Sequence, residues 1–493
     1  MKLKELIKEK EIIQRIHYTN TIEIKHLAYN SRKVKKDSLF VAIKGFKTDG
    51  HRYIKEAIHQ GAKIIVCQVL PEDIKNDITY IKVENPRQLM GLIASRFYNF
   101  PSQKIMITGT TGTNGKTSVT YMLKTIFTKN NEKCGLFGTI NNQIGDKLID
   151  NAGRTTPDSL EIQADIAEML DEQCTRLFME VSSHALDLGR VNGVAFDYGI
   201  FTNLTQDHLD YHKTFEAYFE AKSKLFYKTQ KANIINGDDL WGQKLVKHLK
   251  QKTTIPVYTY GLSLENDYYA KDIHYAIEGT KYTLVTPKEA IDIYIDIPGE
   301  VMVYNSMAAI INALCEGIEI EKIQEALATM DIVEGRMERV DLKTSFDIII
   351  DYAHTPDGLE KLLKAMRTLY DGKIYLVFGC NGDRDKAKRP IMGHIAGEYA
   401  DFVIVTSDNP ASEDPQKIID TVALAVAEKN KNYSTVLKRW DAIDYAVTLP
   451  QKGDVLVLAG KGHEKQETMA KENLYYNEWE TVEKAVKKYN EKG

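Results

Sequence analysis

The sequence has few cysteines, and they are far apart. No two of them form a C-x-x-C pair. The five cysteines are Cys67, Cys134, Cys174, Cys315 and Cys380. This spacing argues against a disulfide scaffold and against a cysteine zinc site, and it is typical of a reducing compartment.

Long apolar runs are also missing. Residues 1–18 alternate Lys and Glu with Leu and Ile, and they lack the apolar stretch of a signal peptide. No run approaches the roughly 18 apolar residues that a bilayer-spanning helix needs. We therefore expect a cytoplasmic protein without membrane insertion.

An excess of charge of one sign is absent as well. The formal net charge is −4, and both signs are spread along the chain. A general nucleic-acid-binding protein normally carries a strong basic excess, so this class is disfavoured. A small anionic substrate stays possible, because a local basic pocket does not register in the total charge.

What the chain does contain is enough apolar sequence for several cores. Its 493 residues exceed what one core usually serves. Short apolar runs alternate with helical stretches, which indicates an α/β protein with parallel sheets covered on both faces. The predicted strands are 38–43, 63–67, 78–83, 104–108, 177–181, 198–202, 346–350, 373–378, 402–405 and 454–458. We expect three domains, at 1–100, 101–333 and 334–493.

The most informative stretch is a glycine-rich loop at residues 108–117 (TGTTGTNGKT). It follows a predicted strand and precedes a helix with an apolar stripe from Val119 to Phe127. Backbone N–H groups of such a loop wrap phosphate oxygens, and the helix dipole adds positive potential. Lys116 is placed to reach the β- and γ-phosphates, and the Thr117 hydroxyl to hold Mg²⁺. The alternative is a glycine turn with a chance Gly-Lys-Thr.

Acids and histidines follow the next predicted strands. Glu180 stands at a strand end, where a Mg²⁺ ligand belongs, although a surface glutamate in a salt bridge would look the same. Residues 203–212 (NLTQDHLDYH) contain two aspartates and two histidines, and Asp207 and His208 are adjacent members of this set. This density favours metal or phosphate binding over a purely structural role.

A lysine falls on the apolar side of the helix predicted at 215–227. Lys222 is four residues from Tyr218 and three from Phe219, whereas Lys224 lies off that face. Burial lowers the pKa of a lysine, and a neutral amine adds CO₂ to form an anionic carbamate. The alternative is a lysine whose stem alone is buried while its ammonium reaches water.

Residues 112–117 resemble the ATP loop of the Mur ligase family, which also contains folylpolyglutamate synthase. The resemblance implies an acid–amino-acid ligase that uses ATP as co-substrate and two Mg²⁺ ions. It implies metal binding by Thr117, Glu180, His208 and the carbamate of Lys222, and it makes Lys116, Glu180, His208 and Lys222 the catalytic residues. The implied ATP-binding residues are Gly112, Thr113, Asn114, Gly115, Lys116, Thr117, Ser118, Asn305, Arg336, Asp351 and His354.

The motifs around Ser31, His51, Thr155 and Ser182 resemble those of particular family members. These members extend UDP-N-acetylmuramoyl-L-alanyl-D-glutamate by a third residue in the synthesis of peptidoglycan. The motifs imply an N-terminal UDP-binding domain, a central ATPase-like domain and a C-terminal Rossmann-like domain. The implied UDP-sugar-binding residues are Ser31, Arg32, Gly45, His51, Thr155, Thr156, Ser182 and Arg190. A solvated turn would account equally for the basic residues near the diphosphate at 44–51.

The loops expected to bind the incoming amino acid contain residues that favour different amino acids. They contain Arg384, Asp408, Asn409, Ala411, Gly460 and Glu464. Diaminopimelate-adding members have arginine where Ala411 stands, which favours L-lysine. Arg384, Gly460 and Glu464 match the diaminopimelate type, so meso-diaminopimelate or lanthionine is slightly preferred.

Two interpretations from other classes and one from within the ligase class remain as rivals. These are a P-loop kinase or motor ATPase, a ligase-like subunit without activity, and folylpolyglutamate synthase. The resemblance implies small-molecule partners (the UDP-linked dipeptide, a diamino acid and ATP), no nucleic acid, and a monomer. It also implies an acyl-phosphate intermediate.

Overall fold

The computed structural model describes all residues except 20, 46–47, 150–152, 471 and 492–493. It divides into two compact units, each made of several chain segments. The first unit comprises Met1–Thr111, Asn131–Gly199 and Ala221–Ala232, and the second comprises Gly112–Asn130, Ile200–Glu220 and Asn233–Gly493.

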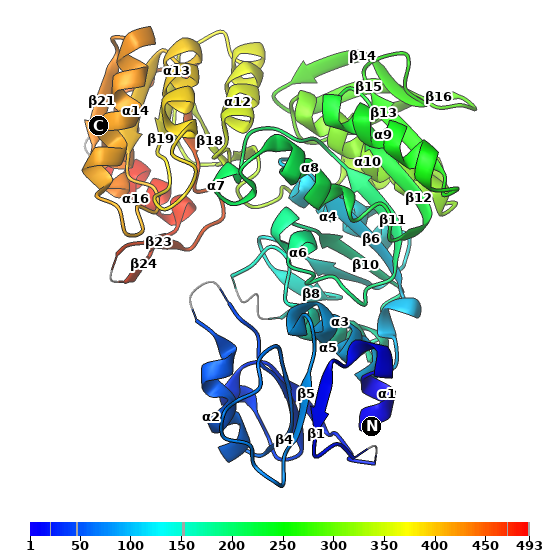
Figure 1. Ribbon diagram of the computed structural model, residues 1–493. Helices are drawn as coiled ribbons and strands as arrows, with labels where there is room; N and C mark the ends of the chain where they lie inside the picture. Colours follow the sequence, from blue (N-terminus) through cyan, green and yellow to red (C-terminus); the bar gives the residue numbers. More distant parts are fainter. Residues whose placement is uncertain (20, 46–47, 150–152, 471, 492–493) are drawn as a thin grey trace. The chain divides into compact units, whose positions relative to one another are not determined.

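The first apolar runs of the chain form a five-stranded sheet in the first unit (Figure 1). Its order is β1-β5-β4-β3-β2, parallel except for β1 against β5. The strands are β1 (Gln14–Ile16), β2 (His26–Ala28), β3 (Ser38–Val41), β4 (Ala62–Cys67) and β5 (Thr79–Lys82). Alternate strand residues enter two cores, one with α1 (Leu3–Leu6) and α3 (Pro86–Phe97) and one with α2 (Ile54–His59).

The remaining strands of the first unit lead to the glycine loop. Strands β6 (Met106–Thr111), β10 (Arg176–Glu180) and β7 (Cys134–Phe137) are parallel neighbours. Strands β8 (Asn142–Ile144) and β9 (Lys147–Ile149) add an antiparallel edge. Helices α5 (Ser159–Asp171) and α6 (Ser183–Asp187) belong to the same unit. Glu180 pairs with Thr110 at the carboxyl end, so it lies at the sheet edge from which the loop departs.

The second unit begins with the loop and helix α4 (Lys116–Lys129). Strands β13 (Val257–Gly261), β14 (Tyr268–Ala276), β15 (Gly279–Val285) and β16 (Ala290–Ile295) follow, antiparallel from β14 to β16. Its helices here are α7 (Leu209–His212), α9 (Leu240–Lys252), α10 (Glu300–Cys315) and α11 (Ile320–Ala328). The boundary between the units passes through β11 (Phe196–Phe201), α8 (Phe215–Ser223) and β12 (Thr229–Asn236).

The C-terminal part of the second unit is a doubly wound sheet of order β17-β18-β22-β19-β20-β21, parallel except at β17. The strands are β17 (Glu338–Arg339), β18 (Asp347–Asp351), β19 (Ile374–Phe378), β20 (Phe402–Thr406), β21 (Tyr433–Val436) and β22 (Val455–Ala459). One face packs on α12 (Pro356–Leu369), α13 (Lys388–Tyr399) and α14 (Pro415–Lys429), drawn in yellow and orange in Figure 1. The other packs on α15 (Arg439–Ala446) and α16 (Glu478–Asn490).

The structure confirms the α/β class and each predicted strand, with small shifts at the ends. One helix boundary was wrong, because α8 ends at Ser223 and residues 224–227 form turns. The antiparallel strands β14 to β16 and the hairpin of β23 (Gln466–Thr468) and β24 (Asn473–Tyr475) were not predicted. Within the described ranges, no helix is long and apolar enough to cross a membrane. The domain boundaries at 100 and 333 stay a prediction.

Candidate active site

Two glycines of the loop are required by their surroundings. A Cβ atom on Gly112 would lie 1.8 Å from Thr202 Oγ1, and one on Gly115 would lie 2.5 Å from Asn305 Oδ1. Gly115 also has a φ of +87° where it caps α4, a conformation that favours glycine. The loop thus passes close to both neighbours, and the first turn of α4 presents N–H groups that have no intrahelical acceptor.

The loop is fixed to residues that follow β11. Asn203 O accepts from Thr113 N at 2.9 Å, and Asn203 Oδ1 accepts from Asn114 N at 2.9 Å. Lys116 Nζ donates to Gly112 O and Thr113 O at 3.0 and 2.9 Å, so its ammonium lies over the loop. This is the arrangement of a phosphate-binding loop with its lysine.

A cavity of about 210 Å³ adjoins the loop within the second unit. Six residues predicted to bind ATP line it. They are Asn114, Gly115, Ser118, Asn305, Arg336 and Asp351. The other predicted ATP residues, namely Gly112, Thr113, Lys116, Thr117 and His354, do not line this cavity. Apolar walls from residues 298–302 and α12 suit a nucleoside, and sequence reasoning missed them.

Residues near the start of the third predicted domain contact the loop. Arg336 Nη2 donates to Thr117 Oγ1 at 3.1 Å, and Asn114 Nδ2 donates to Asp357 Oδ2 at 2.8 Å. The Arg336 guanidinium also lies over the Tyr352 ring, 4.9 Å from its centre. Asp351 accepts from Met337 N and Ala353 N, and burial raises its pKa. The predicted metal ligand Thr117 therefore shares its hydroxyl with an arginine.

The histidines near the loop are arranged around one carboxylate. Asp207 Oδ2 lies 3.5 Å from His208 Nε2 and 3.9 Å from His354 Nε2. Burial opposes ionisation of Asp207, but His208 and Lys388 outweigh it and keep the pKa of Asp207 below its usual range. Burial and Lys388 lower the pKa of His354 to about 4, so its ring is neutral at pH 7. The ionised Asp207 therefore lies close to both imidazole rings.

Glu180 is buried, with an exposure of 1%. Its carboxylate accepts from Thr139 N at 2.8 Å and from Thr139 Oγ1 at 2.9 Å. Among the described residues it has no Lys, Arg or His in salt-bridge range, which excludes the alternative of a surface salt bridge. A buried carboxylate without a cationic side chain needs a cation from elsewhere.

The donor set fits Mg²⁺. No cluster of three or more His, Cys, Asp or Glu suited to a metal occurs in the described part of the chain. Mg²⁺ is usually bound by one or two carboxylates together with phosphate oxygens and water, so a larger cluster is not required. Glu180 would offer one such carboxylate, and a nucleotide would supply the phosphate.

Lys222 is as buried as Glu180, with an exposure of 1%. Its inward position agrees with the prediction from the helical spacing. Lys224 is exposed and pairs with Asp187 at 2.8 Å. Because Lys222 is enclosed to its tip, its ammonium does not reach water, which excludes the alternative of a buried stem with a solvated head. Its carbamate stays a prediction.

The predicted sugar-binding residues of the central domain meet in the first unit. Thr156 Oγ1 donates to Glu180 O at 2.9 Å and accepts from Ser182 N at 3.0 Å. Arg190 Nη1 donates to Thr156 O at 3.4 Å, and Thr155 Oγ1 accepts from Thr139 Oγ1 at 3.1 Å.

Asp158, which sequence reasoning missed, holds the arginines of this region. It contacts Arg190 at 3.3 Å, Arg87 at 3.9 Å and also Arg154. Burial lowers the pKa of Arg190, which Asp158 opposes. Three arginines around one aspartate leave surplus positive charge, which suits an anionic substrate.

Several predicted UDP-binding residues of the N-terminal loops make contacts within the protein. Ser31 Oγ donates to Glu56 Oε2 at 3.0 Å, while Arg32 is exposed. His51 Nδ1 lies 2.7 Å from Asp49 Oδ1, and His51 Nε2 accepts from Gln68 N at 3.1 Å. Both ring nitrogens thus have partners within the protein. Gly45 N donates to Thr48 O, and residues 46 and 47 of this loop lie outside the described residues.

The predicted amino-acid-binding residues follow strand ends of the C-terminal sheet. Asn409 Nδ2 donates to Glu464 Oε2 at 2.6 Å, and a Cβ atom on Gly460 would lie 2.6 Å from Asp408 Oδ2. Burial raises the pKa of Asp408 and of Glu464. Arg384 is exposed and makes no polar side-chain contact with any residue described in the structure. Ala411 N donates to Thr468 O at 3.0 Å.

Comparisons with known proteins find relatives over nearly the whole chain. The family descriptions "Mur ligase family, catalytic domain", "Mur ligase middle domain" and "Mur ligase, glutamate ligase domain" match residues 23–98, 110–313 and 335–462. A relative from Clostridioides difficile named UDP-N-acetylmuramoyl-L-alanyl-D-glutamate--2,6-diaminopimelate ligase is 44% identical, covering 99% of this chain and 100% of the relative. A ligase of the same name, numbered 1, from Clostridium acetobutylicum is 45% identical, covering 94% and 95%.

Solved structures share this fold. A structure of a UDP-N-acetylmuramoyl-L-alanyl-D-glutamate--2,6-diaminopimelate ligase matches with a TM-score of 0.69 and 28% identity, covering 99% of both chains. MurF from Acinetobacter baumannii matches with a TM-score of 0.66 at 17% identity, covering 89% of this chain and 90% of that one. With 40–45% identity to full-length ligases, the chain belongs to the Mur ligase family.

Proposed function

We propose that this chain is a cytoplasmic, monomeric, ATP-dependent ligase that adds a diamino acid to UDP-N-acetylmuramoyl-L-alanyl-D-glutamate in peptidoglycan synthesis. The observation that carries the proposal is the 44% identity, over essentially its whole length, to a relative that is named for this reaction. The glycine loop, the adjoining cavity and the buried Glu180 and Lys222 support it, because a kinase, a motor ATPase or an inactive subunit does not require this combination. The domains are proposed at 1–100, 101–333 and 334–493.

The reaction proceeds by an acyl phosphate. The γ-carboxylate of the D-glutamyl residue attacks the γ-phosphorus of ATP, an oxygen–phosphorus bond forms, and ADP leaves. The substrate amine then attacks the activated carbonyl, forming the amide as phosphate leaves and a proton is lost. Lys116 stabilises charge on the transferred phosphoryl group, and Asp207 keeps His208 oriented toward it. Bound Mg²⁺ would supply further positive charge, held by Glu180, Thr117, His208 and the carbamate of Lys222.

The substrate-binding roles follow from the same family pattern. Thr155, Thr156, Ser182 and Arg190 would bind the UDP-linked dipeptide together with Ser31, Arg32, Gly45 and His51. Asp408, Asn409, Gly460 and Glu464 would bind the incoming amino acid. For that amino acid we propose meso-diaminopimelate. The relatives are named for it, and the exposed Arg384 is available for a distal carboxylate that Ala411 cannot bind.

The test is phosphate release with the UDP-linked dipeptide, ATP and a panel of amino acids. We expect release with meso-diaminopimelate to exceed that with L-lysine, with lanthionine between them or equal to the first. Reactions without the dipeptide, without the amino acid, or with folate and glutamate serve as controls. Steady ATP hydrolysis in the absence of both substrates would indicate an NTPase. A strong preference for L-lysine would refute the proposed amino acid, and activity with folate and glutamate would refute the proposed UDP-linked substrate.

Glu180→Gln tests the metal site. This change keeps the size of the side chain but removes the charge, so we expect the Mg²⁺ concentration that gives half-maximal rate to rise by about 10- to 100-fold. Glu172→Gln is the matched control, because Glu172 is exposed and pairs with Lys133. An unchanged Mg²⁺ requirement in Glu180→Gln would remove this residue from the metal site.

A further inference from the structure

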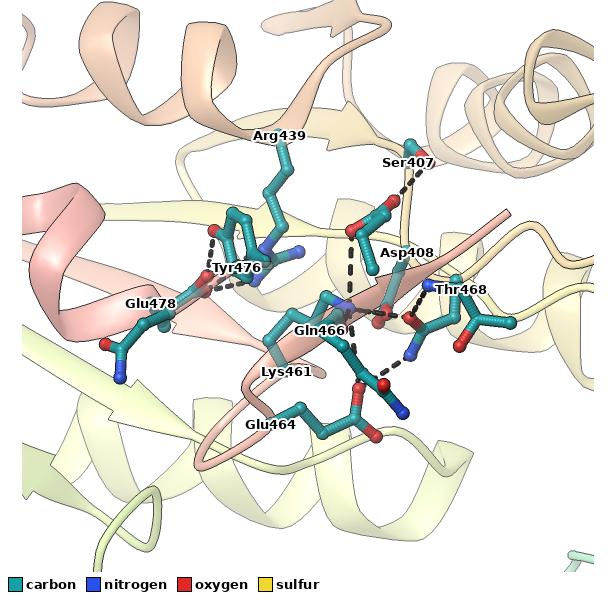
Figure 2. A network of polar contacts seen from close by, with 12 residues as sticks. Ser407, Asp408, Arg439, Lys461, Glu464, Gln466, Thr468, Tyr476 and Glu478 are labelled. Carbon is teal, nitrogen blue, oxygen red and sulfur yellow. Dashed lines mark hydrogen bonds and ion pairs between the residues drawn. The ribbon is translucent and has the colours of Figure 1, made fainter. Parts of the chain in front are cut away.

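The C-terminal domain contains a fully buried lysine that the mechanism above does not use. Lys461 follows β22 and Gly460, and its side chain has an exposure of 0%. Its Nζ donates to Asn409 Oδ1 and to the Gln466 carbonyl oxygen, each at 2.7 Å. Figure 2 shows this ammonium at the centre of the polar network that includes Asp408 and Glu464. A lysine is rarely buried completely unless its charge is paired.

Three carboxylates surround this single ammonium. Lys461 Nζ lies 3.3 Å from Glu467 Oε2, 3.4 Å from Glu464 Oε2 and 3.8 Å from Asp408 Oδ1. The neighbouring cation does not balance them, because Arg439 is paired with Glu478 (Figure 2). The cluster therefore has fewer positive than negative charges, and a substrate ammonium would reduce the difference.

Two of these acids have unsatisfied oxygens. Both oxygens of Asp408 and Oε2 of Glu467 are buried without a hydrogen-bond partner among the described residues. A buried carboxylate oxygen without a hydrogen bond is costly even beside a shared ammonium, so such a group favours a further cation or a proton. The raised pKa values of Asp408 and Glu464 agree with this excess of negative charge.

Lys461 also determines the orientation of the predicted ligands. Asn409 Oδ1 accepts from Lys461 Nζ and from Thr468 N at 2.9 Å. The amide nitrogen of Asn409 therefore faces the other way and donates to Glu464 Oε2 at 2.6 Å. The other oxygen of Glu464 accepts from Tyr352 Oη at 3.1 Å. A chain of contacts thus runs from Lys461 through Asn409 to Glu464.

We propose that Lys461 is a positioning residue of the amino-acid pocket. It fixes Asn409 and Glu464 and only partly neutralises the three carboxylates, so that the acid cluster binds one ammonium group of the incoming diamino acid. This inference rests on the proposed function. Lys461 itself does not contact the reacting atoms. Its loss would weaken binding of the amino acid while leaving the ATP loop and the sugar-binding residues unchanged.

The experiment compares Lys461→Met with the wild-type chain in phosphate release. Methionine is also long and unbranched but has no charge. We expect KM for diaminopimelate to rise roughly 10- to 100-fold, the size expected when a charge-assisted hydrogen bond is lost. KM for ATP and for the UDP-linked dipeptide should stay within about twofold. In the variant, protons taken up by the acid cluster replace the lost positive charge at pH 7. These protons dissociate by pH 9, so the rise in the diaminopimelate KM should shrink over this range.

Lys465→Met is the matched control. Lys465 lies in the same loop but is 63% exposed, with Glu334 at 3.7 Å, so its loss should leave all three KM values unchanged. If Lys461→Met does not fold, Lys461→Gln carries the same expectation near the lower, tenfold end, because it keeps a hydrogen-bond donor but no charge.

The outcomes separate this inference from the proposed function. A diaminopimelate KM within twofold of wild type in a folded variant overturns the role of Lys461. Equal losses in all three KM values, with a lower Tm, also overturn it, because they indicate a purely structural lysine. If the wild-type chain releases no phosphate with any amino acid, the proposed function fails and this inference fails with it.

Discussion

Replacing Lys222 with alanine is expected to lower the rate of ligation by about 1000-fold or more. The side chain is enclosed at 1% exposure, and its neutral amine would add CO₂ and release a proton to give a carbamate. That anion would hold Mg²⁺ beside the nucleotide, and losing one preorganised electrostatic group in an active site typically costs 100- to 1000-fold. Loss of the metal ligand would lower the rate of ligation further. The measurement is phosphate release with the UDP-linked dipeptide and diaminopimelate.

Chemical rescue distinguishes a carbamate from a structural lysine. Alanine leaves a space that formate or acetate can enter, so either anion should restore part of the activity of Lys222→Ala, whereas chloride should not. Lys224→Ala is the control, because Lys224 is exposed and pairs with Asp187 on the surface; it should keep full activity. Full activity of Lys222→Ala without added anion would refute the assignment.

Lys222 also illustrates what sequence reasoning predicts well. Its inward direction follows from spacing alone, because residues three and four apart share one face of a helix. The parallel strands are predicted for a similar reason, since continuous apolar runs of four to six residues form buried strands. The helix end at Ser223 was missed, because Leu225 and Phe226 continue the apolar pattern into a turn and are buried there.

Lys461 shows the opposite case. A lysine between two glycines in a polar loop is typically solvated. Its burial depends on Asp408, which follows another strand, and on Glu464 and Glu467, which the following residues fold back onto it. Asp158 was missed for the same reason, since the arginines that surround it come from three separate segments. Sequence patterns indicate which residues a helix or strand buries, but polar clusters assembled from several loops have no periodic signal.

Gly112→Ala is expected to weaken ATP binding by about 100-fold, because a misplacement of about 1 Å in a catalytic loop has an effect of this size. The new Cβ would lie 1.8 Å from Thr202 Oγ1 and 3.1 Å from the backbone N and O of Asn203. Thr202 Oγ1 donates to Asn114 O at 2.6 Å, so moving it disrupts the loop itself. Titration calorimetry with ATP, together with the ligation rate, measures the effect.

Two further variants separate this clash from ordinary backbone strain. Gly317→Ala also places a side chain at positive φ (+75°), but nothing lies within 4 Å of its Cβ position, so it should lower stability by about 1 kcal/mol and leave ATP affinity unchanged. Adding Thr202→Ala to Gly112→Ala removes the atom that clashes most severely, and the double variant should recover part of the lost affinity. Normal ATP binding by Gly112→Ala alone would mean that the loop tolerates a Cβ there and does not hold phosphate in this conformation.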